Sequence, residues 1–129
     1  MTLPHEDAEA LAEVTEIFHR YEAALLRNDV ALLDGMFLRS ERTVRYGVAE
    51  VQYGIDEIRR FRARQSPFDR SLSRTVITTF GRDLAIAATL FHRMDAPGQI
   101  GRQMQTWIRT DMGWLIAAAH VSMMPDTET

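Results

Sequence analysis

The chain has 129 residues, of which 46% are hydrophobic and 26% charged, and this balance predicts one globular domain over residues 1–129. A formal net charge of −3 excludes a basic surface of the kind that binds nucleic acid. The chain has no cysteine, and all fifteen of its basic residues are arginines, so a cysteine nucleophile and a lysine Schiff base are both excluded. The acidic start is unlike a signal peptide, and no apolar stretch approaches the roughly 20 residues of a membrane span. We therefore expect a cytoplasmic protein that contacts no membrane.

The first half of the chain predicts three helices and a short hairpin. Apolar residues recur at intervals of three and four over about residues 4–27, which predicts one long helix: Leu11, Val14, Phe18, Tyr21 and Leu25. Asp29 can cap a short second helix, and a third helix begins after Gly54 and ends before Pro67. Between them, residues 43–46 and 51–53 pair as a hairpin. The arginines at 59, 60 and 64 are expected on the solvated face of the third helix.

The second half predicts a meander of long strands over about residues 70–80, 83–94, 99–110 and 113–123. A sheet of such strands must twist strongly, and the long helix can lie across its concave face. The sequence therefore predicts an α+β fold with three helices on a curved, mostly antiparallel sheet. This cone is closed at one end and open at the other, and the opening is the natural pocket.

The last strand carries two polar side chains that strict alternation places on a covered face. His120 and Ser122 share their face with Trp114 and Ile116, and a covered polar group needs a partner. Residues two apart on a strand stand about 6.6 Å from each other. A nucleophile and its base must meet within roughly 3 Å. We therefore expect His120 and Ser122 to line the pocket and bind substrate, without forming a catalytic pair.

Four further residues are candidates for the pocket. Arg74 falls on an otherwise apolar face of the first long strand, where it either reaches the sheet edge or meets an anion inside. Arg45 points either to solvent or to the pocket, and Tyr21 is either a core aromatic or a pocket hydroxyl. Trp107 joins the substrate-binding candidates, although alternation leaves open whether its face of the strand points inward.

The acidic residues and the histidines give no sign of a metal site or of a carboxylate base. No carboxylate falls in the middle of a predicted strand facing the cone. The four histidines, His5, His19, His92 and His120, show no ligand spacing. We expect no metal and no cofactor.

Three segments resemble the nuclear transport factor two-like superfamily, whose cystatin-like cone also includes the SnoaL-like polyketide cyclases: residues 21–29, 54–58 and 114–122. Residues 101–110, together with the closing Ala-Ala-His-Val-Ser, resemble the narrower AtzH-like family of cyanuric acid and related nitrogen catabolism. That resemblance implies an amidohydrolase that removes one carboxylate-bearing end of 1,3-dicarboxyurea to give allophanate. It further implies a working pair of a tyrosine from the first helix and an arginine from the first strand, matched here by Tyr21 and Arg45.

Three functions are compatible with these features. The first is a metal-free hydrolase acting on a small carboxylated urea or amide, with Tyr21 and Arg45 as catalytic residues. The second is a non-catalytic module that binds a small acid and partners an amidase. The third is a cyclase or isomerase, which the missing strand carboxylate disfavours. In each case we expect a homodimer through the outer face of the sheet, because the helices cover only one side.

Overall fold

Three helices pack against one six-stranded sheet in the computed structural model, which describes residues 4–127. The helices are α1 (Ala8–Arg27), α2 (Val30–Asp34) and α3 (Ile55–Arg62). The strands are β1 (Val44–Tyr46), β2 (Val51–Tyr53), β3 (Arg70–Thr79), β4 (Leu84–Arg93), β5 (Gln99–Thr110) and β6 (Gly113–Pro125). The order across the sheet is β2-β1-β6-β5-β4-β3, and every neighbouring pair is antiparallel except β1 with β6. The predicted α+β fold is confirmed.

Local sequence sets both ends of α1. The helix begins at Ala8, later than the predicted residue 4, because the Asp7 carboxylate accepts a hydrogen bond from the backbone N–H of Ala10 at 2.9 Å and so caps the first turn. Asn28 ends it in the left-handed conformation, at φ 54°. Asp29 then caps α2 through the backbone N–H of Leu32, as predicted.

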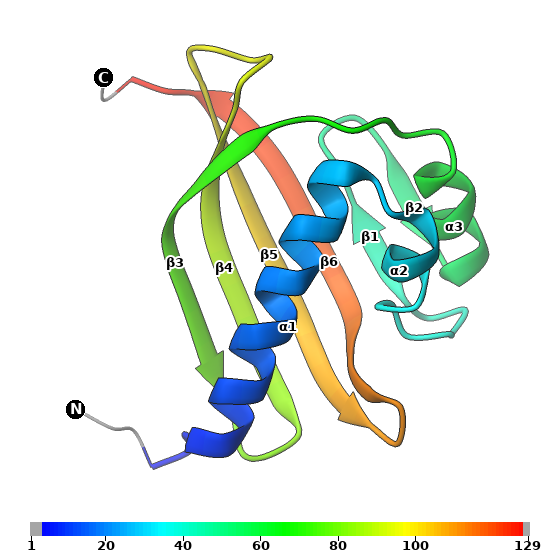
Figure 1. Cartoon of the computed structure of the whole chain (residues 1–129), viewed down its shortest axis with the longest axis vertical. Coiled ribbons are helices and arrows are strands. Elements are labelled where there is room, and N and C mark those ends of the chain that lie inside the picture. Colours follow the sequence, from blue (N-terminus) through cyan, green and yellow to red (C-terminus); the bar gives the residue numbers. More distant parts are fainter. Residues whose placement is uncertain (1–3, 128–129) are drawn as a thin grey trace.

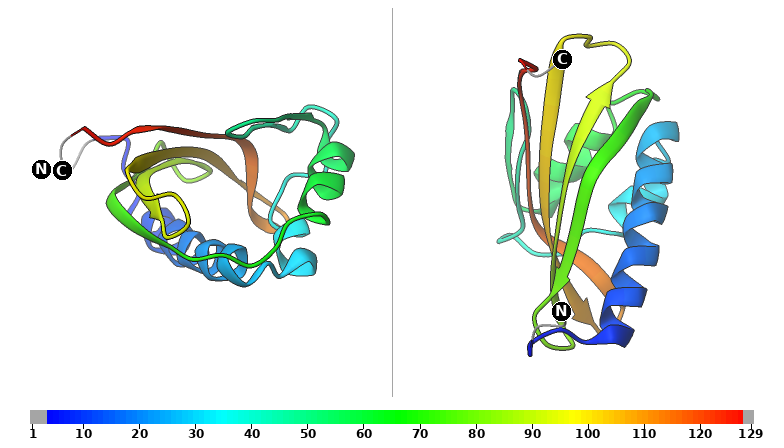
Figure 2. Two further views of the ribbon diagram at one scale, coloured as in Figure 1. Left: turned by 90° about the horizontal axis from the view of Figure 1, so that it is seen from above. Right: turned by 90° about the vertical axis from the view of Figure 1, so that its left-hand side faces the viewer.

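The core lies between α1 and the concave face of the sheet. The sheet curls around α1, as the view from above in Figure 2 shows. The apolar stripe of the helix meets the inner side chains of the central strands, and the largest fully buried side chains include Phe18, Phe37, Trp107 and Ile116. One layer of helices therefore covers one face of the sheet only.

Two register shifts decide which strand residues face inward. In the β5–β6 ladder, Trp107 pairs with Ile116 but Thr106 pairs with Ala118, so β6 holds one extra residue. An extra residue in a strand moves every later side chain to the opposite face. Ile116 therefore faces the core, while His120 faces outward.

A second shift lies in β3, between Ser73 and Val76. Arg70 and the partly buried Leu72 face the concave side before it, and Ile77 faces that side after it. The alternation predicted from the sequence fails at both shifts, because a bulge leaves no clear mark in the pattern of apolar residues.

The outer face of the sheet is left open by the helices. Several large apolar side chains on this face are exposed, among them Val51, Tyr53, Val76 and Met104. No helix in residues 4–127 combines the length and the apolar character needed to cross a membrane.

Candidate functional site

A cavity of about 400 Å³ opens where α1 ends, between the concave face of the sheet and α3. The segment from α3 to β3 crosses over the sheet here (Figure 1). Fifteen residues line the cavity: Tyr21, Leu25, Arg45, Val48, Glu50, Phe61, Arg62, Gln65, Phe68, Arg70, Phe91, Arg93, Gln103, Val121 and Met123. Four of them are arginines and only one is acidic, so the lining favours an anionic ligand.

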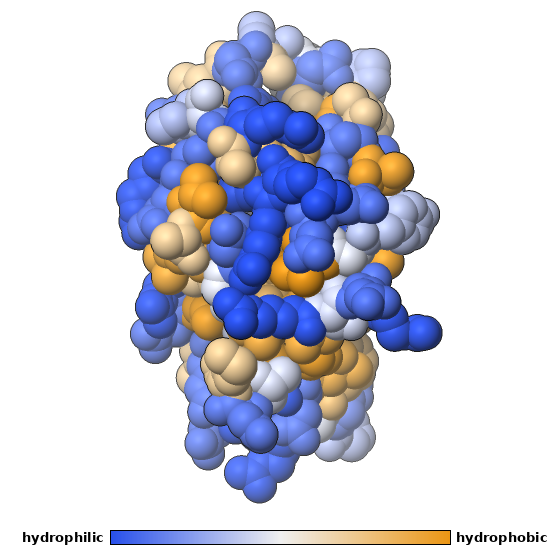
Figure 3. Space-filling view, turned by 90° about the vertical axis from the view of Figure 1, so that its right-hand side faces the viewer, coloured by the Kyte–Doolittle hydropathy of each residue, from blue (hydrophilic) through white to orange (hydrophobic). Residues whose placement is uncertain are grey.

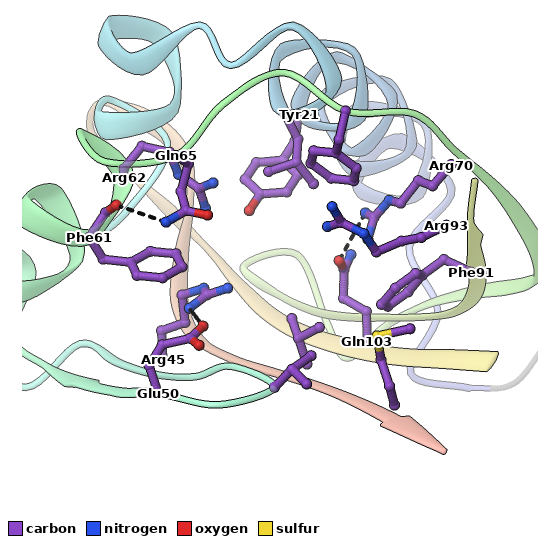
Figure 4. A pocket seen from close by; sticks show the side chains of 15 residues that line it. Tyr21, Arg45, Glu50, Phe61, Arg62, Gln65, Arg70, Phe91, Arg93 and Gln103 are labelled. Atoms are coloured by element: carbon purple, nitrogen blue, oxygen red, sulfur yellow. Dashed lines mark hydrogen bonds and ion pairs between the residues drawn. The ribbon is translucent and has the colours of Figure 1, made fainter. Parts of the chain in front are cut away.

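Tyr21 presents a free hydroxyl to this cavity. Its ring is held edge-on between Phe37 and Trp107, each with a ring centroid 6.2 Å away, and the residue is only 4% exposed. The hydroxyl points into the cavity (Figure 4) and has no hydrogen-bond partner in residues 4–127. A rigid ring with an uncommitted hydroxyl can donate a proton or a hydrogen bond to a bound molecule.

Arg45 enters the cavity from β1. Its Nη1 donates to Glu50 Oε1 at 3.0 Å and to Gln52 Oε1 at 2.8 Å, and its Cζ lies 4.5 Å from the centroid of the Phe61 ring. Because Tyr46 pairs with the outward-facing His120, its neighbour Arg45 faces inward. The Nε and Nη2 atoms donate to no described residue and are available to a ligand.

Arg70 lies on the β3 side of the cavity in a buried network. Its Nε and Nη2 donate to the two carboxylate oxygens of Glu22 at 2.9 and 2.6 Å, which is a two-pronged ion pair. Nη2 also donates to Gln103 Oε1 at 3.0 Å, and the guanidinium stacks on Phe91 with its Cζ 4.5 Å from the ring centroid. The side-chain amide nitrogen of Gln103 is buried without an acceptor.

The Phe91 ring occupies the space that a side chain at position 101 would need. A Cβ atom at Gly101 would lie 2.1 Å from Phe91 Cζ, so a side chain here would displace the ring. Gly101 therefore leaves the space in which Phe91 supports the guanidinium of Arg70.

Arg62 is the least compensated charge of the site. The residue is 4% exposed, its Nε is buried without a partner, and its guanidinium donates to no residue among 4–127. Desolvation lowers the pKa of Arg62, and the positive charges of Arg45 and Arg70 lower it further, against opposite effects from Tyr21 and Asp34. Figure 4 shows Arg62 and Arg45 on the same side of the cavity, one on each side of Phe61.

The structure places Tyr21 and Arg45 at one cavity, and both lie there as the sequence allowed. Trp107 lies beneath Tyr21 and is fully buried, with its Nε1 donating to Gln105 Oε1 at 3.0 Å. It supports the Tyr21 ring and does not line the cavity.

Arg74, His120 and Ser122 do not lie at the cavity, so their expected positions are wrong. Arg74 sits in the bulge of β3 at φ 50° and is exposed. The bulge in β6 turns His120 and Ser122 to the outer face, where Ser122 accepts from Nε of Arg102 at 3.1 Å. The same bulge brings Val121 into the lining.

Arg62, Arg70 and Gln103 were not among the predicted site residues. A signal for Arg62 exists, since it follows Ile55 by seven positions and Ile58 by four and so falls on the buried stripe of α3. By contrast, Arg60 and Arg64 are exposed to solvent. Figure 3 shows many hydrophilic residues on the face of the molecule that carries α3. Arg70 and Gln103 had no comparable signal.

The AtzH-like family model matches residues 4–127. The chain belongs to the AtzH-like family. A crystal structure of a protein of unknown function from Pectobacterium atrosepticum is 55% identical to this AtzH-like chain, with a TM-score of 0.89 over 96% of this chain and 99% of the other. A cystatin-like fold protein from Burkholderia xenovorans is 44% identical, with a TM-score of 0.89 over 93% and 95% of the two chains.

More distant structures share the fold of this AtzH-like protein. A ketosteroid isomerase-like protein from Erwinia carotovora atroseptica is 15% identical, with a TM-score of 0.76 over 93% of this chain and all of the other. A comparison with curated proteins finds no match. These neighbours show that the chain has the fold of the nuclear transport factor two-like proteins.

Proposed function

We propose that this AtzH-like protein is a hydrolase that removes one carboxylate from a small N-carboxylated urea or amide, with conversion of 1,3-dicarboxyurea to allophanate as the reaction to test first. The observation that carries the proposal is the unpartnered Tyr21 hydroxyl, fixed by aromatic contacts in a cavity that also contains four arginines. Such a cavity offers hydrogen-bond donors to a ligand rich in acceptors.

The reaction needs one proton at one nitrogen. The bond between a terminal carboxylate carbon and the adjacent urea nitrogen breaks, and its electron pair stays with the nitrogen. That nitrogen takes a proton from Tyr21, and the carbon leaves as CO₂, which water converts to bicarbonate. Water then returns a proton to Tyr21, so the tyrosine is unchanged after each turnover.

Arg45 supplies orientation. Its free Nε and Nη2 can hold the terminal carboxylate, while Nη1 stays fixed by Glu50 and Gln52. N-carboxylated ureas are labile, so the fixed placement of the breaking bond beside a proton donor supplies much of the catalysis. No nucleophilic side chain is required.

The test is turnover of 1,3-dicarboxyurea by purified protein, with allophanate and bicarbonate followed by ¹³C NMR. The spontaneous rate in buffer is subtracted. Tyr46→Phe is a matched control, because it removes a tyrosine hydroxyl from the outer face of the sheet. Turnover above background in both the unmodified protein and Tyr46→Phe supports the proposal. Binding of the compound without turnover would support an acid-binding module instead.

A further inference from the structure

Three of the four arginines that line the cavity are neutralised by a carboxylate. Arg45 pairs with Glu50 at 3.0 Å, and Arg70 holds Glu22 through two hydrogen bonds. In the third ion pair, Asp95 meets Arg93 at 2.8 Å. Among residues 4–127, no carboxylate lies within ion-pair distance of Arg62, and Asp34 stabilises its charge only from farther away.

The unpaired charge of Arg62 is built into the cavity wall. The residue is more than nine-tenths buried and lines the cavity, so its charge is largely removed from solvent. A buried guanidinium without an anion is unfavourable, and a carboxylate placed against it would relieve that cost. The Tyr21 hydroxyl and the side-chain amide nitrogen of Gln103 also lie at this cavity without acceptors among the described residues. They can therefore donate hydrogen bonds to further acceptor atoms of a ligand.

Arg45 and Arg62 lie close enough to hold one small molecule. Their guanidinium carbons are 4.5 and 5.6 Å from the centroid of the same Phe61 ring, on neighbouring elements of the cavity wall. Figure 4 shows both directed toward the space below Tyr21. One is neutralised by Glu50 and the other is not.

This difference in net charge assigns the two ends of a dicarboxylated substrate. A carboxylate that leaves as CO₂ loses its negative charge, so a net positive site beside it would stabilise the reactant more than the transition state. A carboxylate that stays on the product keeps its charge throughout, and a net positive site can hold it without slowing the reaction.

We propose that Arg62 binds the carboxylate that the substrate keeps, while the neutralised Arg45 and Tyr21 act at the end that leaves. The assignment rests on the proposed function for its chemistry. It makes Arg62 a binding residue that selects substrates with a second carboxylate.

The first experiment measures binding without turnover. Glutarate has the chain length of 1,3-dicarboxyurea and cannot lose CO₂ by the same route, and butyrate has one carboxylate on a chain of similar size. Isothermal titration calorimetry compares both acids on the unmodified protein, Arg62→Gln and Arg62→Lys. Arg60→Gln is the matched control, because Arg60 is exposed on the same helix.

Glutarate should bind the unmodified protein and Arg60→Gln with equal affinity. Both proteins should bind glutarate more tightly than butyrate. Arg62→Gln should weaken glutarate binding roughly tenfold to a hundredfold, as expected for loss of a charge-assisted contact. Arg62→Lys should recover part of the loss. Equal glutarate affinity in Arg62→Gln and the unmodified protein, or no glutarate binding to either, would overturn the assignment.

Kinetics on 1,3-dicarboxyurea separate this inference from the proposed function. Arg62→Gln should raise KM by a factor similar to the loss of glutarate affinity and leave kcat nearly unchanged, because the contact is made equally in the ground and transition states. Turnover with an unchanged KM in Arg62→Gln would refute the role of Arg62 and leave the hydrolase standing. Arg62-dependent glutarate binding without any turnover would refute the hydrolase and leave the anion site standing.

Discussion

Arg62 and Arg70 should respond oppositely when each is replaced by methionine. Both guanidinium groups are buried, and methionine keeps much of the unbranched stem that packs in the cavity wall. They differ in what the substitution leaves behind. Arg62→Met removes an unpaired buried cation, whereas Arg70→Met leaves the carboxylate of Glu22 without its two-pronged partner.

The magnitudes follow from the cost of burying charge. Breaking a buried ion pair costs about 3–5 kcal/mol, and the Glu22 side chain is only 13% exposed, so we expect Arg70→Met to lose about 3 kcal/mol. Removing the unpaired Arg62 charge should raise the free energy of unfolding by about 1 kcal/mol in the absence of ligand. For a chain of this length about 1 kcal/mol shifts Tm by about 4 °C. The Tm of Arg62→Met should therefore lie about 4 °C above that of the unmodified protein, and the Tm of Arg70→Met about 12 °C below it.

Differential scanning calorimetry without added acids measures both shifts, with Arg60→Met as the control for loss of an arginine from an exposed position. Glutarate should raise the Tm of the unmodified protein and leave that of Arg62→Met nearly unchanged. If Arg62→Met is destabilised as strongly as Arg70→Met, the charge of Arg62 is already compensated within the protein, which would refute this prediction.

Four further predictions concern the site and the assembly. Tyr21→Phe should keep the fold and ligand binding and lower kcat by roughly 10²–10⁴-fold, measured on 1,3-dicarboxyurea, and a rate near that of the unmodified protein would remove the proposed acid. Arg45→Lys keeps the charge but loses the planar fork, so KM should rise while some turnover remains; an unchanged KM would argue against carboxylate binding there. Light scattering at micromolar concentration should show a homodimer, because Val51, Val76 and Met104 leave an apolar outer sheet face exposed, and a monomer would refute this. EDTA should leave turnover unchanged, and activity lost to EDTA and restored by zinc would contradict a metal-free mechanism.

The helical part of the molecule follows closely from the sequence, because its signals are local. The spacing of apolar residues predicts the buried stripe of α1 and places Tyr21 on it. Asp29 caps α2 as predicted, and the hairpin of β1 and β2 forms where its residues indicate. The order and type of all elements are confirmed, and the one clear boundary error, the start of α1, comes from a cap at Asp7 in place of an earlier start.

Two β-bulges decide which strand residues line the cavity, and period-two alternation along the sequence does not predict a bulge. One extra residue in β6 exchanges His120 and Ser122 for Val121 and Met123 at the cavity. One extra residue in β3 leaves Arg74 outside, while Arg70, before the shift, faces inward. A bulge is stabilised by the twist of the whole sheet, so the residues at its position do not predict it.

The sequence by itself determined that this chain has fifteen arginines and no lysine, a tyrosine on the apolar stripe of its first helix and no cysteine chemistry. Only the tertiary structure decided which arginines meet, and which of them lack a counterion. Glu22 and Arg70 are 48 positions apart, and Glu50 neutralises Arg45 across a turn, whereas Arg62 forms no ion pair with any described residue. The physical reason is that pairing depends on distances of a few ångströms between distant segments, and those distances are fixed by how α1, α3 and the twisted sheet pack together.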